Sequence, residues 1–182
     1  KNIMNIKGLP LYLHNVLYAL DSSKIEEVYV STDYKIIDDA KEKYGYKVIH
    51  RPHHLCQDQS SHQEVMVHGL NEIERRTKKE CDILVVLFGN TLGARTADLD
   101  AGIDLLINNP ELDSVQSVSE YTMFNPFRAF KIVDDSKLET IVTQKFIKEN
   151  IQGKLSNDRN AAGKVYFMNG SFWIIRKKTL IK

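Results

Sequence analysis

The chain has 182 residues, of which 42% are hydrophobic and 27% are charged, so a packed core is feasible and disorder is not favoured. Its formal net charge is +1, from 25 basic and 24 acidic residues, and this balance argues against a nucleic-acid partner, which would need a basic excess. A small phosphorylated ligand needs only a few local donors and stays compatible with this composition. The length favours one domain over two small ones.

The chain contains two cysteines, Cys56 and Cys81, and no long apolar run. One disulfide is conceivable, but reduced thiols in a cytoplasmic protein are the favoured interpretation. No apolar segment reaches the roughly 18–20 residues that a membrane-spanning helix needs. We therefore expect a cytoplasmic protein without a membrane partner.

The first third of the chain alternates helical and extended patterns. Leucines and a valine at helical spacing predict a helix over about residues 10–22. β-Branched residues predict a strand over Glu26–Thr32, and the next pattern predicts a helix over residues 33–45 that ends at Gly45. A short strand over residues 46–51 and a loop follow.

The middle of the chain continues this alternation. A helix is predicted from Ser61 to about Lys79, with Ser61 and Glu64 as a capping box at its start. The apolar run Ile83–Phe88 predicts a buried strand, and a further helix is predicted from Thr96 to about Asn108.

The last third contains mostly strand patterns. Residues 113–121 predict a strand, and residues 127–140 predict a hairpin that turns at residues 134–136. Residues 143–163 are irregular or partly helical. Two strand pieces, separated at Asn169-Gly170, end the chain.

Strands that alternate with helices of about a dozen residues predict right-handed βαβ units. We therefore expect an α/β, Rossmann-like fold with a mostly parallel sheet and helices on both of its faces. Ligands of such open sheets bind beyond the carboxyl ends of the strands. Small polar or basic residues stand at several of these ends or before a helix: Ser31-Thr32-Asp33, Arg51, Asp58, Ser60 and Ser61.

The segment Gly89-Asn90-Thr91 follows the apolar strand directly and has two interpretations. As a ligand site, its glycine would let the backbone approach a ligand, and the helix that starts at Thr96 would offer free N–H groups to an anion. As an ordinary turn, Thr96 would be the N-cap and Gly93 would take a positive φ. Local chemistry alone favours the turn, and the polar residues at the other strand ends raise the odds of a site.

Five stretches, spread in order over nearly the whole chain, together resemble one family: KNI…KGLPLYLHNVLYAL, EEVYVSTDYKIIDDAKEKYG, RPHHLCQDQSSHQEVMVHGL, DILVVLFGNTLGARTADLDAGIDLL and DRNAAGKVYFMNGSFWI. The family is the cytidylyltransferases that activate acidic nine-carbon sugars, CMP-sialic acid synthetase and its relatives. Each motif alone is weak, whereas five in order are fairly specific.

The resemblance implies a GT-A-like nucleotidyltransferase fold that transfers CMP from CTP to an acidic, nonulosonic-type sugar and releases pyrophosphate, in surface-glycan biosynthesis. It implies Mg²⁺ or another divalent cation as cofactor, and a homodimer with contacts between Ser119 and Arg176. We expect residues 1–182 to form one nucleotidyltransferase domain. The family's Gly-rich phosphate loop would lie before Lys1, and its Asp-x-Asp metal site would lie beyond Lys182.

The resemblance also implies roles for individual residues. The expected catalytic residues are Lys1 and Arg159. The expected nucleotide-binding residues are Asn2, Ser61, Gly89, Asn90 and Thr91. The expected sugar-binding residues are Arg128, Asn169 and Gly170. Each position also has a structural interpretation, as a solvated cation, a helix cap or turn chemistry, and the metal ligands stay unassigned.

The chain departs from the family pattern at two places. The family's Gln-Pro is Gly89-Asn90 here, and an expected arginine is Phe167, so the identity of the sugar stays open. Two alternatives also stay open: another nucleotide-sugar pyrophosphorylase, or a non-catalytic nucleotide-binding relative. The histidines between residues 50 and 62 match no strong metal-ligand spacing, and we expect no metal there.

Overall fold

The computed structural model describes residues 1–121, 126–133, 137–143, 145–146, 149 and 163–182. The chain divides into two compact units. The first contains Lys1–Ser117 and Gly170–Lys182, and the second contains Val118–Asn169. The single domain expected over the whole chain stays a prediction.

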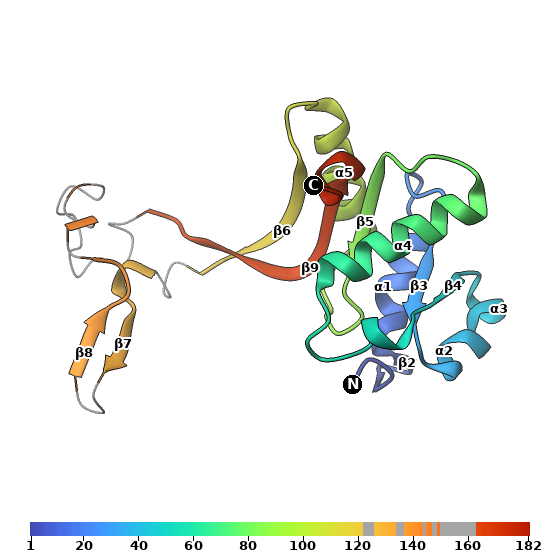
Figure 1. Ribbon diagram of the computed structural model, residues 1–182, viewed down its shortest axis with the longest axis horizontal. Coiled ribbons are helices and arrows are strands. Elements are labelled where there is room, and N and C mark those ends of the chain that lie inside the picture. Colours follow the sequence, from blue (N-terminus) through green and yellow to red (C-terminus); the bar gives the residue numbers. More distant parts are fainter. Residues whose placement is uncertain (122–125, 134–136, 144, 147–148, 150–162) are drawn as a thin grey trace. The chain divides into compact units, whose positions relative to one another are not determined.

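The first unit contains most of the helices and strands (Figure 1). In chain order they are β1 (Asn5–Ile6), β2 (Leu9–Pro10), α1 (Leu11–Leu20), β3 (Tyr29–Thr32), α2 (Lys35–Asp39), α3 (Lys41–Tyr44), β4 (Lys47–His50), the 3₁₀ turn η1 (His53–Leu55), α4 (His62–Thr77), β5 (Ile83–Leu87), α5 (Thr96–Asn108), the first part of β6 (Ser114–Glu120), the second part of β9 (Tyr166–Arg176) and α7 (Lys177–Leu180). This order confirms the predicted alternation from α1 to α5.

Strands β3 and β4 form a parallel pair in register from Tyr29 opposite Lys47 to Thr32 opposite His50. Helix α1 packs against this pair through an apolar cluster that includes Leu13 and Val48. Because the strands are parallel, their carboxyl ends meet at one edge.

The second sheet of this unit has the strand order β5-β9-β6. β5 and β9 are antiparallel, with Ile83 opposite Arg176 and Leu87 opposite Phe172. The mostly parallel sheet expected from the sequence is therefore not what the described residues form, since one described pair is parallel and the sheets are small and mixed. The physical reason is that β9 returns from the second unit beside β5, which the βαβ pattern did not anticipate.

Helices cover both faces of the β5-β9-β6 sheet, as expected. On one face, Met66 and Leu70 of α4 pack in a cluster that includes Leu84 and Ile175. On the other face, Ile103 and Leu106 of α5 pack in a cluster with four strand residues: Ile83, Val85, Val115 and Ile174. Burial on both faces explains why β5 is an uninterrupted aliphatic run.

Three local predictions were wrong at element ends. The single helix expected over residues 33–45 is split into α2 and α3 at Ala40, although Gly45 does end it with φ 82°. Ser61 is the N-cap of α4, but its side chain makes no capping hydrogen bond, so no capping box forms. Thr96 is the first residue of α5 and not its N-cap, because its hydroxyl donates to Tyr18 O at 3.1 Å.

A fourth difference is in the last strand. The two pieces expected around Asn169-Gly170 are one strand, β9, of eleven residues. An Asn-Gly pair favours a hairpin turn, and Gly170 does take a left-handed φ of 72°, but the strand continues past it because β9 pairs with its neighbours in the sheet.

The second unit contains an antiparallel hairpin of β7 (Phe130–Val133) and β8 (Lys137–Thr140), as predicted. The 3₁₀ turn η3 (Pro126–Arg128) precedes it. Alternate residues of the hairpin share a face, so Phe130, Ile132 and Leu138 lie on one side and are exposed at 55%, 71% and 61%. Apolar side chains are thus concentrated on one face of this hairpin.

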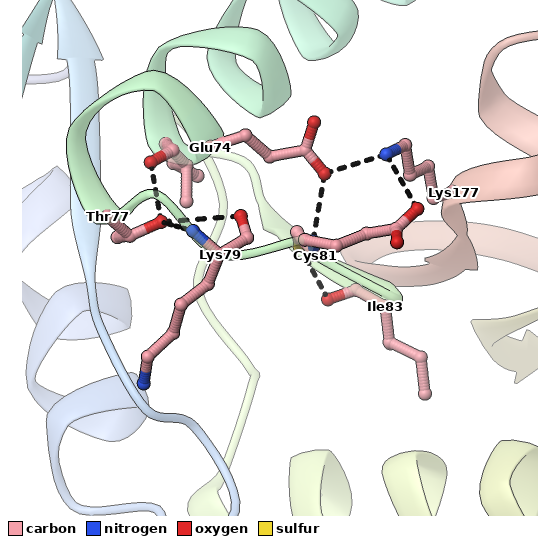
Figure 2. A network of polar contacts seen from close by, with 8 residues as sticks. Glu74, Thr77, Lys79, Cys81, Ile83 and Lys177 are labelled. Atoms are coloured by element: carbon pink, nitrogen blue, oxygen red, sulfur yellow. Dashed lines mark hydrogen bonds and ion pairs between the residues drawn. The ribbon is translucent and has the colours of Figure 1, made fainter.

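A polar network joins the end of α4 to β5 and α7 in the first unit (Figure 2). Glu74 Oε1 accepts hydrogen bonds from the backbone N–H of Cys81 and from Lys177 Nζ, both at 2.8 Å. Lys177 also donates to Glu80 at 3.0 Å. The ammonium of Lys177 and the Cys81 N–H hold the pKa of Glu74 below its ordinary value. The network fixes the turn that leads into β5.

Both cysteines are free thiols, as expected. Burial raises the pKa of the Cys81 thiol, whose Sγ donates to Ile83 O at 3.3 Å. In the part of the chain that the structure describes, no helix is both long enough and apolar enough to cross a bilayer.

We predict that Glu74→Gln lowers stability near neutral pH and that this difference vanishes in acid. A carboxyl whose folded pKa is depressed contributes stability above its unfolded pKa, about 4.3, and loses it as the pH falls through the folded pKa. Urea unfolding of both proteins at pH 7 and across the acid range measures this. Glu80→Gln is the matched control, because Glu80 contacts the same lysine but its side chain is 73% exposed. A difference that is equal at every pH would contradict the assignment.

Candidate functional site

The loop after β5 is held in place by the buried side chain of Asn15 in α1. Asn15 is 2% exposed, and its Nδ2 donates to the carbonyl oxygens of Phe88 at 2.9 Å and Thr91 at 3.1 Å. Both partners are acceptors only, so the amide nitrogen must be the atom that faces them. One side chain from a distant part of the sequence thus binds both ends of the Phe88–Thr91 turn.

Thr91 ties the same loop to β9. Its Oγ1 lies 3.0 Å from Phe88 O and 3.1 Å from Gly170 O, and its backbone N–H donates to Phe88 O at 3.3 Å. The predicted nucleotide residue Thr91 and the predicted sugar residue Gly170 are therefore in contact. The Thr91 hydroxyl holds the loop, which is the turn chemistry that the sequence left open beside a binding role.

Asn2 and Gly89 also lie together at this loop. A Cβ added at Gly89 would lie 3.4 Å from Tyr12 Cβ and 3.6 Å from Asn2 Nδ2. Asn2 is held at the start of α1, because Tyr12 N donates to Asn2 O at 3.0 Å. The structure thus brings four predicted site residues to one loop: Asn2, Gly89, Thr91 and Gly170.

The start of α4 adjoins the loop. The rings of His62 and Phe88 have centroids 5.7 Å apart, with a tilt of 37° between their planes. Ser61, which precedes His62, is exposed and has no capping bond, so its hydroxyl is not used by the helix end. The N-terminus of a 16-residue helix therefore lies beside the loop, where its first amides favour an anion.

Asn90 and the loop amides face no described partner. Asn90 is exposed, and among the residues that the structure describes, neither its side chain nor the backbone N–H groups of Gly89, Asn90 and Leu92 form a hydrogen bond. The loop therefore has fixed carbonyls and free donors. Such a cradle of N–H groups suits phosphate or other acceptor oxygens.

The remaining predicted site residues lie away from this loop or outside the residues that the structure describes. Lys1 is exposed at the chain start, and its carbonyl accepts from Met4 N. Asn169 belongs to the second unit, where its amide donates to Ser119 Oγ at 3.0 Å. Arg128 is in η3, but its side chain is not among the described atoms. Arg159 lies outside the described residues.

A second polar group forms at the ends of β3 and β4. Arg51 donates through its guanidinium to Ser31 Oγ at 3.2 Å and to Ser31 O at 2.7 Å. Thr32 is buried, and its hydroxyl accepts from Tyr34 N at 3.0 Å. The sequence-based expectation that polar residues meet at parallel strand ends is confirmed for this pair.

A hollow of about 400 Å³ between α3, β4 and α4 is not the favoured site. Its cationic side chains already have partners: Lys41 pairs with Asp38, Lys47 pairs with Glu27, and Arg76 donates to Val48 O. Little charge is left there for a ligand, and the loop after β5 offers more free donors.

The neutral donors of the loop do not form a magnesium site. Mg²⁺ in proteins is held by carboxylates together with waters or phosphates, whereas the loop presents amide and hydroxyl groups from Asn2, Asn90 and Thr91. In the described ranges, no three side chains of His, Cys, Asp or Glu gather in a way that would hold a metal ion. The described residues therefore do not fit the expected metal, and we assign no ligand.

Asn15 and His62 are the contributors that sequence reasoning missed. Asn15 shares the buried face of α1 with Tyr12, Val16 and Ala19. A polar residue at a core position of an amphipathic helix is a detectable signal, because buried amides need partners. The partners themselves, 73 and 76 residues away, were not predictable from local spacing.

The fold and the loop define the class, and comparisons with known proteins define the family. The chain is similar to a solved CMP:2-keto-3-deoxy-manno-octonic acid synthetase complexed with CTP, with a TM-score of 0.65 and 19% identity over 100% of this chain and 69% of the other. The class is thus the nucleotidyltransferase fold. Residues 1–140 match the family model described as cytidylyltransferase, and the chain belongs to that family.

One curated relative is a two-part protein of Helicobacter pylori (strain ATCC 700392 / 26695). Its name is pseudaminic acid cytidylyltransferase and UDP-2,4-diacetamido-2,4,6-trideoxy-beta-L-altropyranose hydrolase. The two are 27% identical over 133 residues, which is 72% of this chain. This chain spans 25% of the length of that relative.

We predict that Gly93→Ala destabilises the protein, whereas Gly89→Ala has a smaller effect. Gly93 has φ 120°, which an L-residue rarely adopts, and an added Cβ would lie 3.5 Å from Ser171 Oγ. The expected loss is about 1–2 kcal/mol. Gly89 is the matched control, because its φ is not positive and its added Cβ would make ordinary contacts. Urea unfolding measures both, and equal losses would contradict the role of the Gly93 backbone.

Proposed function

We propose that this protein is a cytidylyltransferase that transfers CMP from CTP to an acidic sugar and releases pyrophosphate. The observation that carries the proposal is the loop after β5, whose Phe88 and Thr91 carbonyls are bound by side chains while the N–H groups of Gly89, Asn90 and Leu92 have no partner in the described part of the chain. It lies beside the N-terminus of α4 in a chain that belongs to the cytidylyltransferase family.

In this proposal the loop and the start of α4 hold the nucleotide. Free N–H groups and the helix terminus neutralise phosphate oxygens, and they are fixed before the ligand arrives. Asn2, Asn90 and Ser61 supply neutral donors and acceptors for the ribose or the base. Thr91 holds the loop and Gly170, so its role is to position the loop as well as to line the site.

The sugar side of the site draws on the sequence alone. We propose Arg128 for the sugar carboxylate, since guanidinium binds carboxylates bidentately, and Asn169 and Gly170 for sugar hydroxyls. Lys1 and Arg159 are proposed to contact the phosphates during transfer. The name of the Helicobacter relative favours a nonulosonic acid as the sugar class.

The chemistry requires the sugar hydroxyl and the leaving pyrophosphate to be in line at the α-phosphate. A divalent cation such as Mg²⁺ would neutralise phosphate charge when bound. In this proposal the residues of this chain bind the nucleotide and orient it. A cytoplasmic location is proposed from the free cysteines and the cytoplasmic origin of nucleoside triphosphates.

We also propose that the second unit forms a homodimer interface. The occupant we expect is a second copy, because the exposed face of the β7–β8 hairpin carries Phe130, Ile132 and Leu138, with Ile141 just beyond it exposed at 59%. Contiguous exposed apolar residues of this kind mark association surfaces. The family resemblance favours the same region.

We predict that, with Mg²⁺ in the assay, the full-length protein releases pyrophosphate from CTP only when an acidic sugar is present. Asn90→Ala should lower kcat/KM at least about tenfold, because it removes an exposed amide from the proposed nucleotide site. Asn71→Ala, an exposed asparagine in the middle of α4, is the matched control and should change little. ATP, GTP and UTP in place of CTP test the base. Equal use of another nucleotide would favour a different pyrophosphorylase, and no turnover with any sugar would favour a non-catalytic relative.

We predict that Ile132→Glu shifts the protein from dimer to monomer. A charge placed on the apolar face must be desolvated at the interface, so association should weaken by at least about tenfold. Lys137→Glu places a charge on the opposite face of the same hairpin and is the control. Sedimentation equilibrium measures both, and an unchanged dimer in Ile132→Glu, or a monomeric wild type, would contradict the proposal.

A further inference from the structure

The buried amide of Asn15 is costly in a way that packing does not explain. Its Oδ1 is buried and has no hydrogen-bond partner among the residues that the structure describes. Leaving a buried amide oxygen unpaired costs about 1–3 kcal/mol. A leucine, which has the same branching but a larger volume, would avoid that cost on a helix face that is otherwise apolar or aromatic, but it would remove the donor that Thr91 O receives. The function of this asparagine is therefore sought in the two hydrogen bonds that its amide makes.

The two bonds that Asn15 makes fix the direction of two peptide units. In a trans peptide the C=O and the N–H point in opposite directions. Phe88 O and Thr91 O both point at Asn15 on α1, so the N–H groups of the following residues, Gly89 and Leu92, point away from α1. Neither N–H has a hydrogen-bond partner in the described part of the chain.

The other bonds of the loop do not duplicate this effect. Thr91 Oγ1 also contacts Phe88 O, but Thr91 is itself part of the loop and would move with it. Asn15 belongs to α1, which is anchored in the core by Leu13 at 0% exposure and Val16 at 7%. Among the contacts that the described residues make with the turn, Asn15 is the side chain that holds both carbonyls to a rigid element outside the loop.

We propose that Asn15 is a positioning residue for nucleotide binding, because its amide holds Phe88 O and Thr91 O so that the Gly89 and Leu92 N–H groups face the ligand. The inference rests on the proposed function and adds to it a residue that never touches the nucleotide. The N–H groups of Gly89 and Leu92 would donate hydrogen bonds to acceptor oxygens of CTP. Without Asn15 the two peptide units can rotate, and the loop must be ordered at the time of binding.

The test compares Asn15→Leu with wild type and with Ser22→Ala in the full-length chain. Asn15→Leu keeps the branching of the side chain and removes the amide that donates both hydrogen bonds. Ser22 is the matched control, because it is also a buried polar residue, just after α1, and its hydroxyl donates to Asp100 of α5 and not to the loop. CTP affinity is measured by calorimetry, and backbone amide exchange is measured with and without CTP, well below the unfolding temperature of each protein.

We expect CTP to bind at least about tenfold more weakly to Asn15→Leu and within about twofold of wild type to Ser22→Ala, whether or not either variant unfolds at a lower temperature than wild type. We also expect CTP to slow exchange at Gly89 and Leu92 in wild type and not in Asn15→Leu. If Asn15→Leu does not fold, Asn15→Ser, which is too short to reach both carbonyls, is measured by the same criteria.

Three outcomes would overturn the inference. Equal CTP affinity in wild type and the folded Asn15 variant would show that the loop does not need the Asn15 hydrogen bonds to bind CTP. Equal loss in Ser22→Ala would reduce the effect to general destabilisation. If wild type itself binds no CTP, the proposed function fails and the inference fails with it, and this case is recognised from wild type alone.

Discussion

Strand β5 is packed between α4 and α5, with all five of its residues partly buried, and this packing decides where the following loop lies. Its alternate side chains pack against different helices, so neither its register nor its direction can shift without exposing one aliphatic set. Pairing with β9 along one edge also prevents β5 from sliding in the sheet. The loop therefore leaves the sheet at a fixed point, and this point sets the positions of the residues in the candidate site.

The carbonyl groups and the N–H groups of the loop backbone differ in how they are bound. The Phe88 and Thr91 carbonyls are bound by donors from α1 and from Thr91, whereas the N–H groups of Gly89, Asn90 and Leu92 have no partner among the described residues. Water satisfies the exposed N–H groups of an ordinary turn, so this asymmetry fits a strand-to-helix turn as well as a binding loop. The two interpretations of the sequence are compatible, because the turn chemistry would hold the proposed binding surface in place.

The sequence predicted the helices and strands better than it predicted which strands pair and in which direction. Periodicity located α1, α4 and α5 and the apolar run of β5, because each pattern records which faces are buried. It failed at the sheet directions, since β9 pairs with β5 from more than eighty residues away, and at the split between α2 and α3. The family likeness proposed Asn2, Gly89, Thr91 and Gly170 as site residues, and they lie at one loop, although their binding roles stay predictions. The Asn15 contact depends on tertiary packing that no local motif contains.

The chain leaves the first unit at Ser117 and returns at Gly170, and these two points are neighbours. Ser117 Oγ exchanges hydrogen bonds with the backbone of Phe172, so β6 and β9 are already paired where the second unit begins. Residues 118–169 are thus an excursion from two adjacent strands and not a link between distant ends. Such a segment can change in length and in surface without disturbing the strands that carry it. A change confined to residues 118–169 would therefore leave the loop after β5 and its contacts in place.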